Sequence, residues 1–271
     1  VPQALMLFPG HTVIVRGGGD LATGVVHRMH NAGFPIVVLE LEQPLTIRRP
    51  VSVSTAVLDG SHRVESLEAI RMDAFNEALA EAQSGRIPVV VSPQLPDLPP
   101  SCSIVVDARL AKRNVDTSIS DAAFVVGLGP GFNAGNDCHA VIETMRGHRL
   151  GRVLLEGSAA PDTGVPGVVG GESAKRVVRA PRSGRLQWVV SFGDLVAAGE
   201  QLGTIDGSPI ASQIDGVVRG LLAEGVVSPG SKIADVDPRA DRDSCFEISD
   251  KSLSVGGGVV EAVLQWMDRS R

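Results

Sequence analysis

The first part of the chain alternates short, uniformly apolar runs with longer amphipathic segments. The apolar runs are rich in β-branched residues, a pattern typical of strands that are buried on both faces of a parallel sheet. They predict strands over residues 12–16, 35–40, 87–91, 103–107, 124–127 and 152–155. The amphipathic segments predict helices over residues 21–31, 73–83 and 137–146. A turn signal at Asp59-Gly60 predicts a hairpin excursion between residues 51 and 72.

This alternation predicts an α/β fold over residues 1–175, with a Rossmann-like, mainly parallel sheet and helices on both faces. The pattern then changes at residues 161–171 (PDTGVPGVVGG), whose glycines and prolines indicate a linker. Two imperfect copies of a short-strand unit follow, starting at Ser183 and Asp215. Such a duplication predicts a small all-β module over residues 176–238 that closes on itself. Residues 239–271 form a last segment whose helix is expected to return to the first domain.

The turn from Gly193 to Gly199 (GDLVAAG) resembles the turns of biotinyl/lipoyl-type barrel-sandwich domains. In that family a lysine on the hairpin between the two halves carries the cofactor. The matching hairpin here, residues 206–215 (DGSPIASQID), contains no lysine. We therefore expect no covalent biotin or lipoate, and a module with a structural or docking role.

The segment from His11 to Glu42 carries the strongest candidate for a ligand site. Gly17, Gly19 and Ala22 fit the spacing G-x-G-x-x-A between a strand and a helix, and Glu40 follows about twenty residues later, where dinucleotide folds place a ribose-binding carboxylate. Glu42 competes for that role. The residues predicted to bind a nucleotide here are Gly17, Gly18, Gly19, Asp20, Leu21, Ala22 and Glu40. The alternative is a tight turn that binds no ligand.

Two arginines follow this segment, Arg48 and Arg49, and either hold a phosphate through paired hydrogen bonds or form a solvated pair. A second glycine loop spans residues 127–135, after a predicted strand and before the predicted helix at residue 137. Its expected anion-binding residues are Gly127, Gly129, Gly131 and Phe132. The alternative is a loop that only reverses the chain. Asp107, Lys112 and Asn114 are further polar residues after a predicted strand.

Cys138 stands at the predicted start of the helix over residues 137–146, where a thiol can have a lowered pKa and act as a nucleophile. A half-buried structural cysteine is the favoured alternative. The second glycine triplet, Gly256–Gly258, precedes an apolar helical stripe and is either a phosphate loop or, more simply, a flexible hinge. The sequence contains no known metal-binding or hydrolase motif, so it predicts no metal site.

Composition excludes several classes of partner. Only 3% of residues are aromatic, none is tyrosine, and the net charge is -6, so a nucleic-acid surface is not expected. No apolar stretch approaches the roughly 20 residues that span a bilayer, and the first residues, from Val1, lack the charged start of a signal peptide. Three widely spaced cysteines indicate reduced thiols. We therefore expect a cytoplasmic protein with no membrane partner.

Several long phrases together resemble one bacterial family, among them VIVRGGGDLATGVVHRMHNAGFPIVVLELEQPLTIRR, VVGLGPGFNAGNDCHAVIETMRGHRLGRV and CFEISDKSLSVGGGVVEA. This is the YqeB-type family linked to selenium-dependent molybdenum hydroxylases. The resemblance implies an accessory protein in cofactor maturation, with a molybdenum hydroxylase as client and a molybdopterin-type cofactor or nucleotide as ligand. It also implies that Arg48, Arg49 and Lys112 could add positive charge, and that Cys138 could carry sulfur or selenium.

Two other functions stay open on the sequence alone. One is an NAD(P)-dependent oxidoreductase, although the absence of tyrosine excludes the Tyr–Lys pair of many such enzymes. The other is a non-catalytic docking or scaffold protein. The ligand is thus expected to be NAD(P), a CTP-like nucleotide or a molybdopterin-type cofactor, and the sequence leaves assembly into a homo-oligomer open.

Overall fold

The structure is a computed structural model that describes residues 6–165 and 167–269. The chain divides into two compact units. The first comprises Val1–Pro44, Ser52–Asp162 and Ile248–Arg271, and the second comprises Leu45–Val51 and Thr163–Glu247. The sequence-based boundaries differ from these because the short early segment Leu45–Val51 joins the second unit, and the glycine-rich linker belongs to that unit from Thr163 onwards. Val1 and Pro166 lie outside the described residues.

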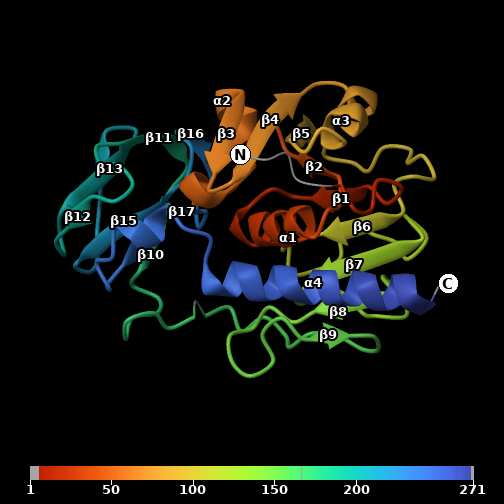
Figure 1. Cartoon of the computed structure of the whole chain (residues 1–271). Coiled ribbons are helices and arrows are strands. Elements are labelled where there is room, and N and C mark those ends of the chain that lie inside the picture. Colours follow the sequence, from red (N-terminus) through yellow and green to blue (C-terminus); the bar gives the residue numbers. More distant parts are fainter. Residues whose placement is uncertain (1–5, 166, 270–271) are drawn as a thin grey trace. The chain divides into compact units, whose positions relative to one another are not determined.

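The first unit is a mixed α/β structure built on one nine-stranded, mostly parallel sheet (Figure 1). Its strands are β1 (Val13–Arg16), β2 (Ile36–Glu40), β3 (Ser61–Val64), β4 (Leu67–Met72), β5 (Ile87–Val91), β6 (Ile104–Asp107), β7 (Phe124–Leu128), β8 (Ala140–Ile142) and β9 (Val153–Leu154). Their order in the sheet is β3-β4-β5-β2-β1-β6-β7-β8-β9. The strands β3 and β9 pair antiparallel at the two edges, and the neighbours between them pair parallel.

The six strands predicted from uniform apolar runs are confirmed, each with ends within one residue of the prediction. Every residue of β1, β2, β6 and β7 is buried, as expected for strands covered on both faces. The hairpin excursion is also confirmed as the pair β3–β4. Its turn lies at residues 65–66, however, because Asp59-Gly60 ends a short helix, α2 (Thr55–Asp59), instead.

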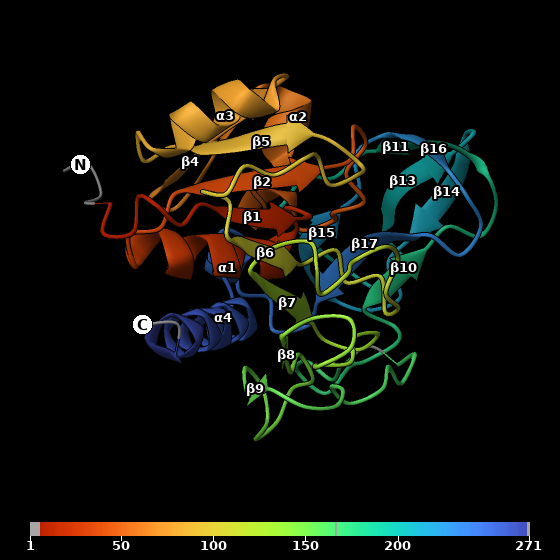
Figure 2. The same ribbon diagram turned by 90° about the vertical axis from the view of Figure 1, so that its right-hand side faces the viewer.

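Three longer helices accompany the sheet: α1 (Asp20–Asn31), α3 (Phe75–Ala82) and α4 (Asp250–Arg269). The small residues Ala78 and Ala82 bury one face of α3 in the core. The last helix, α4, packs side by side with α1 (Figures 1 and 2). A side chain at Gly24 would clash with the Ser252 carbonyl, and one at Gly256 would clash with the Gly24 carbonyl. The second glycine triplet is therefore neither a hinge nor a phosphate loop, because it lies within α4 and permits close helix packing.

The helix predicted over residues 137–146 is wrong. Residues Ala140–Ile142 form strand β8, which pairs parallel with β7. All three of these residues are fully buried, so the local signal is a continuous apolar run and not a helical stripe.

The second unit consists of two four-stranded antiparallel sheets. One has the order β10-β17-β15-β12 and the other β14-β13-β11-β16. The strands are β10 (Val177–Arg179), β11 (Gly184–Trp188), β12 (Leu195–Val196), β13 (Gln201–Ile205), β14 (Ser208–Ala211), β15 (Gly216–Leu221), β16 (Gly225–Val227) and β17 (Lys232–Asp237). Leu186, Leu202 and Val218 belong to one buried cluster drawn from both sheets, so this unit has its own core.

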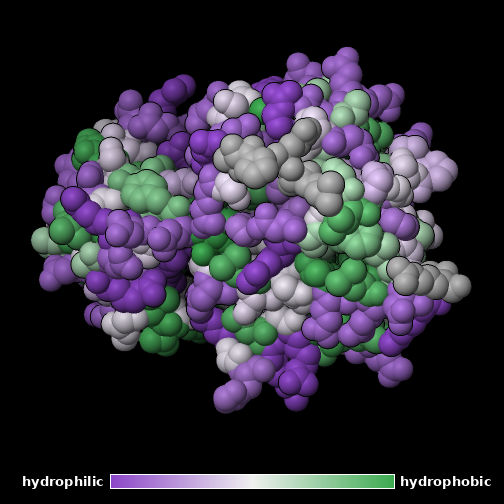
Figure 3. All heavy atoms as spheres, viewed as in Figure 1, coloured by the Kyte–Doolittle hydropathy of each residue, from purple (hydrophilic) through white to green (hydrophobic). Residues whose placement is uncertain are grey.

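The surface shown in Figure 3 intersperses hydrophobic and hydrophilic residues. Among the described residues, no helix has both the length and the apolar character needed to cross a membrane.

Candidate functional site

The first glycine loop joins β1 to α1. Two of its backbone N–H groups already donate hydrogen bonds within the protein. The Gly17 N–H donates to the Leu39 carbonyl at 2.7 Å, and the Gly18 N–H donates to the Glu40 carboxylate at 2.8 Å. A Cβ on Gly18 would lie 2.9 Å from the Ser54 nitrogen. Both glycines thus allow close backbone packing, and the donors at Gly17 and Gly18 are already used.

The Glu40 carboxylate holds this loop in place. It is buried and accepts hydrogen bonds from the backbone N–H groups of Gly18 and Leu41. Burial raises the pKa of Glu40 above its ordinary value, and the two backbone hydrogen bonds offset part of that rise. A ribose hydroxyl would have to compete with these bonds. Gly19 is the N-cap of α1, and Asp20, Leu21 and Ala22 form its first turn.

The second glycine loop is filled by side chains and backbone of the same unit. The ring of Phe132 is buried and occupies the space where Gly127 would carry a side chain. Gly129 lies against Thr144, and Gly131 lies against the backbone of Arg113. The loop leads into β8, so no helix N-terminus stands behind it. The expectation of a helix-assisted anion site at this loop is therefore wrong.

Cys138 is fully buried and does not begin a helix. Burial raises its pKa to about 12, despite hydrogen bonds from the backbone of Gly127 and Ala140. The thiol is therefore protonated at neutral pH, and the local environment does not activate it as a nucleophile.

The other predicted charges have partners in the structure. Arg48 and Arg49 both belong to the second unit, where Arg48 is buried and Arg49 is half-buried. An Arg48 Nη donates to the Ser244 carbonyl at 3.1 Å, whereas the Arg49 Nε donates to the Leu221 carbonyl at 2.9 Å. Lys112 pairs with Asp162 at 2.8 Å, in the first unit.

The order of strands reveals a feature that the sequence did not. From β1 the chain builds the sheet through β2 and β5 on one side, and through β6, β7 and β8 on the other. The reversal between β1 and β6 is a topological switch point, and open α/β sheets bind ligands outside the carboxyl ends of the strands there. Arg16 ends β1 and Asp107 ends β6, as paired neighbours at this point.

Arg16 and Asp107 belong to a network of charged side chains at the switch point. Arg16 is buried and donates to Thr117 Oγ1 at 3.0 Å and to Asp116 at 2.8 Å. Arg109 bridges the Asp107 and Asp116 carboxylates, with 2.7 Å to the latter. Two guanidinium groups thus face two carboxylates. A buried arginine at a strand end has no sequence signature, so neither Arg16 nor Asp116 was predicted.

An open hollow of about 500 Å³ adjoins this network. It is lined by Arg16, Asp116 and Asp121, and by the segment after β5 that carries Gln94, Leu95, Pro96, Asp97 and Leu98. Its volume falls within the range of small-ligand sites, roughly 300–1,000 Å³. Three carboxylates against one arginine make its lining acidic and rich in hydrogen-bond acceptors.

Lys251 brings a further cation to the start of α1. Its amino group lies within electrostatic reach of Asp20 and Glu143. Burial lowers the pKa of Lys251 below its ordinary value, and the neighbouring Asp20 offsets part of that change. No local pattern singles out Lys251 as a site residue, although it lies within the distinctive CFEISDKSLSVGGGVVEA phrase. The described residues include no group of three or more His, Cys, Asp or Glu side chains placed to hold a metal ion.

Comparison with solved structures gives only weak likenesses. A succinylglutamate desuccinylase/aspartoacylase from Rhodobacter sphaeroides is 29% identical, over 24% of this chain and 22% of that chain, with a TM-score of 0.22. An aspartoacylase family protein from Mesorhizobium loti is 14% identical, over 83% of this chain and 84% of that chain, with a TM-score of 0.27. Neither likeness carries an inference about fold or activity.

No family model matches the chain. A curated protein from Escherichia coli (strain K12), "Uncharacterized protein YqeB", is 44% identical over 275 residues. The match covers 98% of this chain and 50% of that protein, so the chain spans about half the length of its curated relative. This identity supports the resemblance to the YqeB-type family that the long sequence phrases indicated.

Proposed function

We propose that the first unit binds a nucleotide or a pterin-nucleotide at the carboxyl edge of its parallel sheet. The observation that carries this proposal is the hollow of about 500 Å³ beside the switch point between β1 and β6. In this proposal the ligand lies across the ends of the central strands, where doubly wound sheets bind nucleotides.

The lining of the hollow favours one end of such a ligand. Asp97 and Asp121, which lie outside the charged network, present acceptors that suit the amino and ring N–H groups of a pterin or the hydroxyl groups of a ribose. Asp97 is exposed, so its carboxylate is accessible to a ligand.

The phosphates would lie towards the start of α1. The helix N-terminus carries partial positive charge, and the Lys251 amino group lies within electrostatic reach of Asp20 in its first turn. Because the donors of Gly17 and Gly18 are used within the protein, Lys251 supplies attraction that this loop does not. This arrangement differs from a conventional dinucleotide site, in which the acidic residue at the position of Glu40 holds the ribose. An NAD(P)-dependent oxidoreductase is therefore the less supported function.

The biological role follows from the family resemblance. We propose that the chain is a cytoplasmic accessory protein that assists maturation of a selenium-dependent molybdenum hydroxylase. The two antiparallel sheets of the second unit suit a barrel-sandwich module, and the hairpin over residues 206–215 offers no lysine for a covalent cofactor. That module would then serve to dock the client enzyme.

Ligand binding can be tested with the full chain by measuring melting temperature with CTP, NAD, NADP and molybdenum cofactor. A ligand that binds the folded state raises the melting temperature. We expect Asp97→Asn to weaken binding of the active ligand about tenfold, since a hydrogen bond to a charged group contributes about 1.5–3 kcal/mol.

Asp73→Asn is the matched control, because Asp73 is also an exposed aspartate and its side chain is 92% exposed. It should bind as the wild type does. Wild-type affinity in Asp97→Asn would contradict the assignment of the hollow. A shift with NADP alone, together with turnover, would favour the oxidoreductase, and no shift with any ligand would favour the docking protein.

A further inference from the structure

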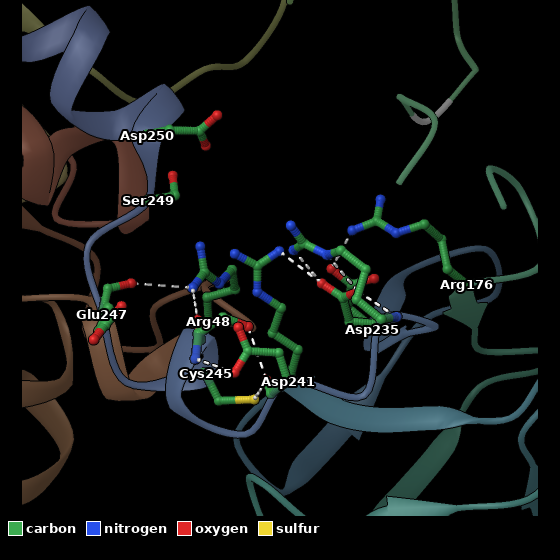
Figure 4. A network of polar contacts seen from close by, with 12 residues as sticks. Arg48, Arg176, Asp235, Asp241, Cys245, Glu247, Ser249 and Asp250 are labelled. Carbon is green, nitrogen blue, oxygen red and sulfur yellow. Dashed lines mark hydrogen bonds and ion pairs between the residues drawn. The ribbon is translucent and has the colours of Figure 1, made fainter. Parts of the chain in front are cut away.

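A cluster of arginines lies on one sheet of the second unit, outside the site proposed above. Its members come from separate parts of the sequence but from one unit: Arg48, Arg176, Arg219 and Arg239. Figure 4 shows Arg48 and Arg176 at the two ends of a row of guanidinium groups, with Asp235 beneath the row.

The local fold explains why these side chains gather. Asp235 and Asp237 alternate along β17 with Val236, which faces the core, so both carboxylates project from the opposite face. The pairing of β15 with β17 shifts between Val218 and Gly220, which places Arg219 in a β-bulge. A bulge redirects a side chain, and here it lets Arg219 reach Asp237.

Arg48 reaches the cluster through a second local feature. A Cβ on Gly220 would lie 2.9 Å from Ile47 Cδ1, so the absence of a side chain admits Ile47. The Leu221 N–H then donates to the Ile47 carbonyl at 2.8 Å, which fixes the segment that carries Arg48.

Two buried carboxylates pair with three of the arginines. Arg176 pairs with Asp235 at 2.7 Å, and Arg219 and Arg239 share Asp237 Oδ2, at 3.2 and 2.6 Å. Arg48 Nη donates to the neutral carbonyl of Ser244. Four guanidinium groups therefore meet two buried carboxylates. Asp241 is nearby but exposed, and its carboxylate accepts from the backbone of its own turn.

Buried polar atoms in the cluster lack partners. The Nε atoms of Arg176 and Arg219 and Oδ1 of Asp235 are buried without a hydrogen bond, and these side chains are at most 10% exposed. Unsatisfied buried donors are rare in proteins and point to a missing partner. Burial lowers the pKa of Arg219, and Arg48 lowers it further. Burial raises the pKa of Asp235, and the nearby positive charges of Lys232, Arg176 and Arg219 act in the opposite direction.

The nearby thiol does not account for the excess charge. Cys245 is fully buried, and burial raises its pKa even though Arg219 and Arg48 act in the opposite direction. A thiolate is therefore not the counter-ion of this cluster.

We propose that this arginine cluster binds a tetrahedral oxyanion, such as a free phosphate or the phosphoryl group of a small molecule. Guanidinium groups match such oxygens with paired, charge-assisted hydrogen bonds. A tetrahedral group offers acceptors in several directions and so suits donors that lie along a row. The side chain of Arg239 is 48% exposed, which leaves a route from solvent.

The test is calorimetric titration of the full chain with inorganic phosphate, at an ionic strength held constant with sodium chloride. We expect saturable binding by the wild type and at least tenfold weaker binding by Arg219→Gln. Arg185→Gln is the control, because Arg185 is an exposed arginine in the same unit, and it should bind phosphate normally. Arg176→Gln provides a second variant if Arg219→Gln does not fold, as judged by circular dichroism.

Absence of saturable binding by the wild type to both inorganic phosphate and a phosphorylated compound would overturn the proposal, as would wild-type affinity in both folded variants. Parallel titrations with CTP distinguish the sources of the oxyanion. Tight binding of phosphate alone indicates a free anion, whereas binding of CTP that depends on Arg219 indicates a phosphoryl group. Asp97→Asn should bind phosphate as the wild type does. The proposal for the arginine cluster can therefore be contradicted without affecting the proposal for the hollow of the first unit, and the reverse also holds.

Discussion

Each unit of the molecule contains a cluster of arginines and aspartates, and the two clusters balance their charges differently. In the first unit, Arg16 and Arg109 face Asp107 and Asp116, and Thr117 completes the hydrogen bonds. In the second unit, four arginines meet two buried aspartates, and some buried nitrogen atoms lack partners.

The difference separates a structural role from a binding role. A balanced network satisfies its own donors and acceptors, so it can fix two loops at the ends of β1 and β6 without a ligand. The second cluster differs because the Nε atoms of Arg176 and Arg219 are buried without a hydrogen bond, which leaves donors that a ligand can use. The same two residue types therefore build a support in one unit and, we infer, an anion site in the other.

The largest expected effect is the loss of a carboxylate from the balanced network. Asp107 is buried and accepts from Thr117 Oγ1 at 2.6 Å as well as from Arg109. Asp107→Ala leaves two arginines with Asp116 alone, and we expect it to lower the free energy of unfolding by about 3–5 kcal/mol. Urea denaturation measures this change.

Glu68→Ala is the control for Asp107→Ala. Glu68 pairs with Arg63 on the surface, where both side chains are more than half exposed, so its loss should cost about 0–1 kcal/mol. Equal losses in the two variants would show that the network at the switch point is not a buried support.

A second, smaller effect compares one arginine from each cluster. Arg16→Gln breaks hydrogen bonds to Thr117 and Asp116, and we expect it to destabilise the protein by about 1–3 kcal/mol. Arg219→Gln removes one of the excess cations, and Asp237 retains Arg239. Without added oxyanion we expect its unfolding free energy to change by less than about 1 kcal/mol. Similar losses, measured by urea denaturation in phosphate-free buffer, would remove the distinction between the clusters.

The sequence predicted those parts of the fold that depend on local patterns. Uniform β-branched runs identified the buried strands, and α1 follows from an amphipathic segment directly after a strand. The helix over residues 137–146 failed because its segment, interpreted as amphipathic, folds as a strand. The three consecutive apolar residues of β8 were the better local evidence.

The sites depended on contacts that no local pattern records. Arg16 and Asp116 lie 100 residues apart, and the bulge that aims Arg219 is a property of strand register. The glycines of both loops were conspicuous, yet in the structure those at Gly18 and Gly127 make room for Ser54 and Phe132. Glycine spacing records where backbone must approach something closely, and it does not distinguish a phosphate from the protein itself.

The smallest expected effect is a difference in pH dependence between one aspartate of each cluster. Burial alone would raise the pKa of Asp116, but Arg16 and Arg109 bring it below its usual value of 3.8. The stability that Asp116 contributes is therefore present above that usual value and is lost as the pH falls through the lower, folded-state value. For Asp235, burial raises the pKa above 3.8. The stability that Asp235 contributes is therefore fully present below pH 3.8, and it is lost as the pH rises through the folded-state pKa of Asp235.

Asparagine variants at these two positions should consequently show opposite trends in urea denaturation between pH 7 and pH 3. The deficit of Asp116→Asn relative to the wild type should shrink as the pH falls, because the wild-type carboxylate becomes protonated. The unfolding free energy of Asp235→Asn should instead fall relative to that of the wild type as the pH falls. The reason is that protonation of Asp235 removes a buried charge from the wild type. Parallel trends in the two variants would mean that Asp235 is as well compensated as Asp116, and the excess of positive charge in the second unit would then need another explanation.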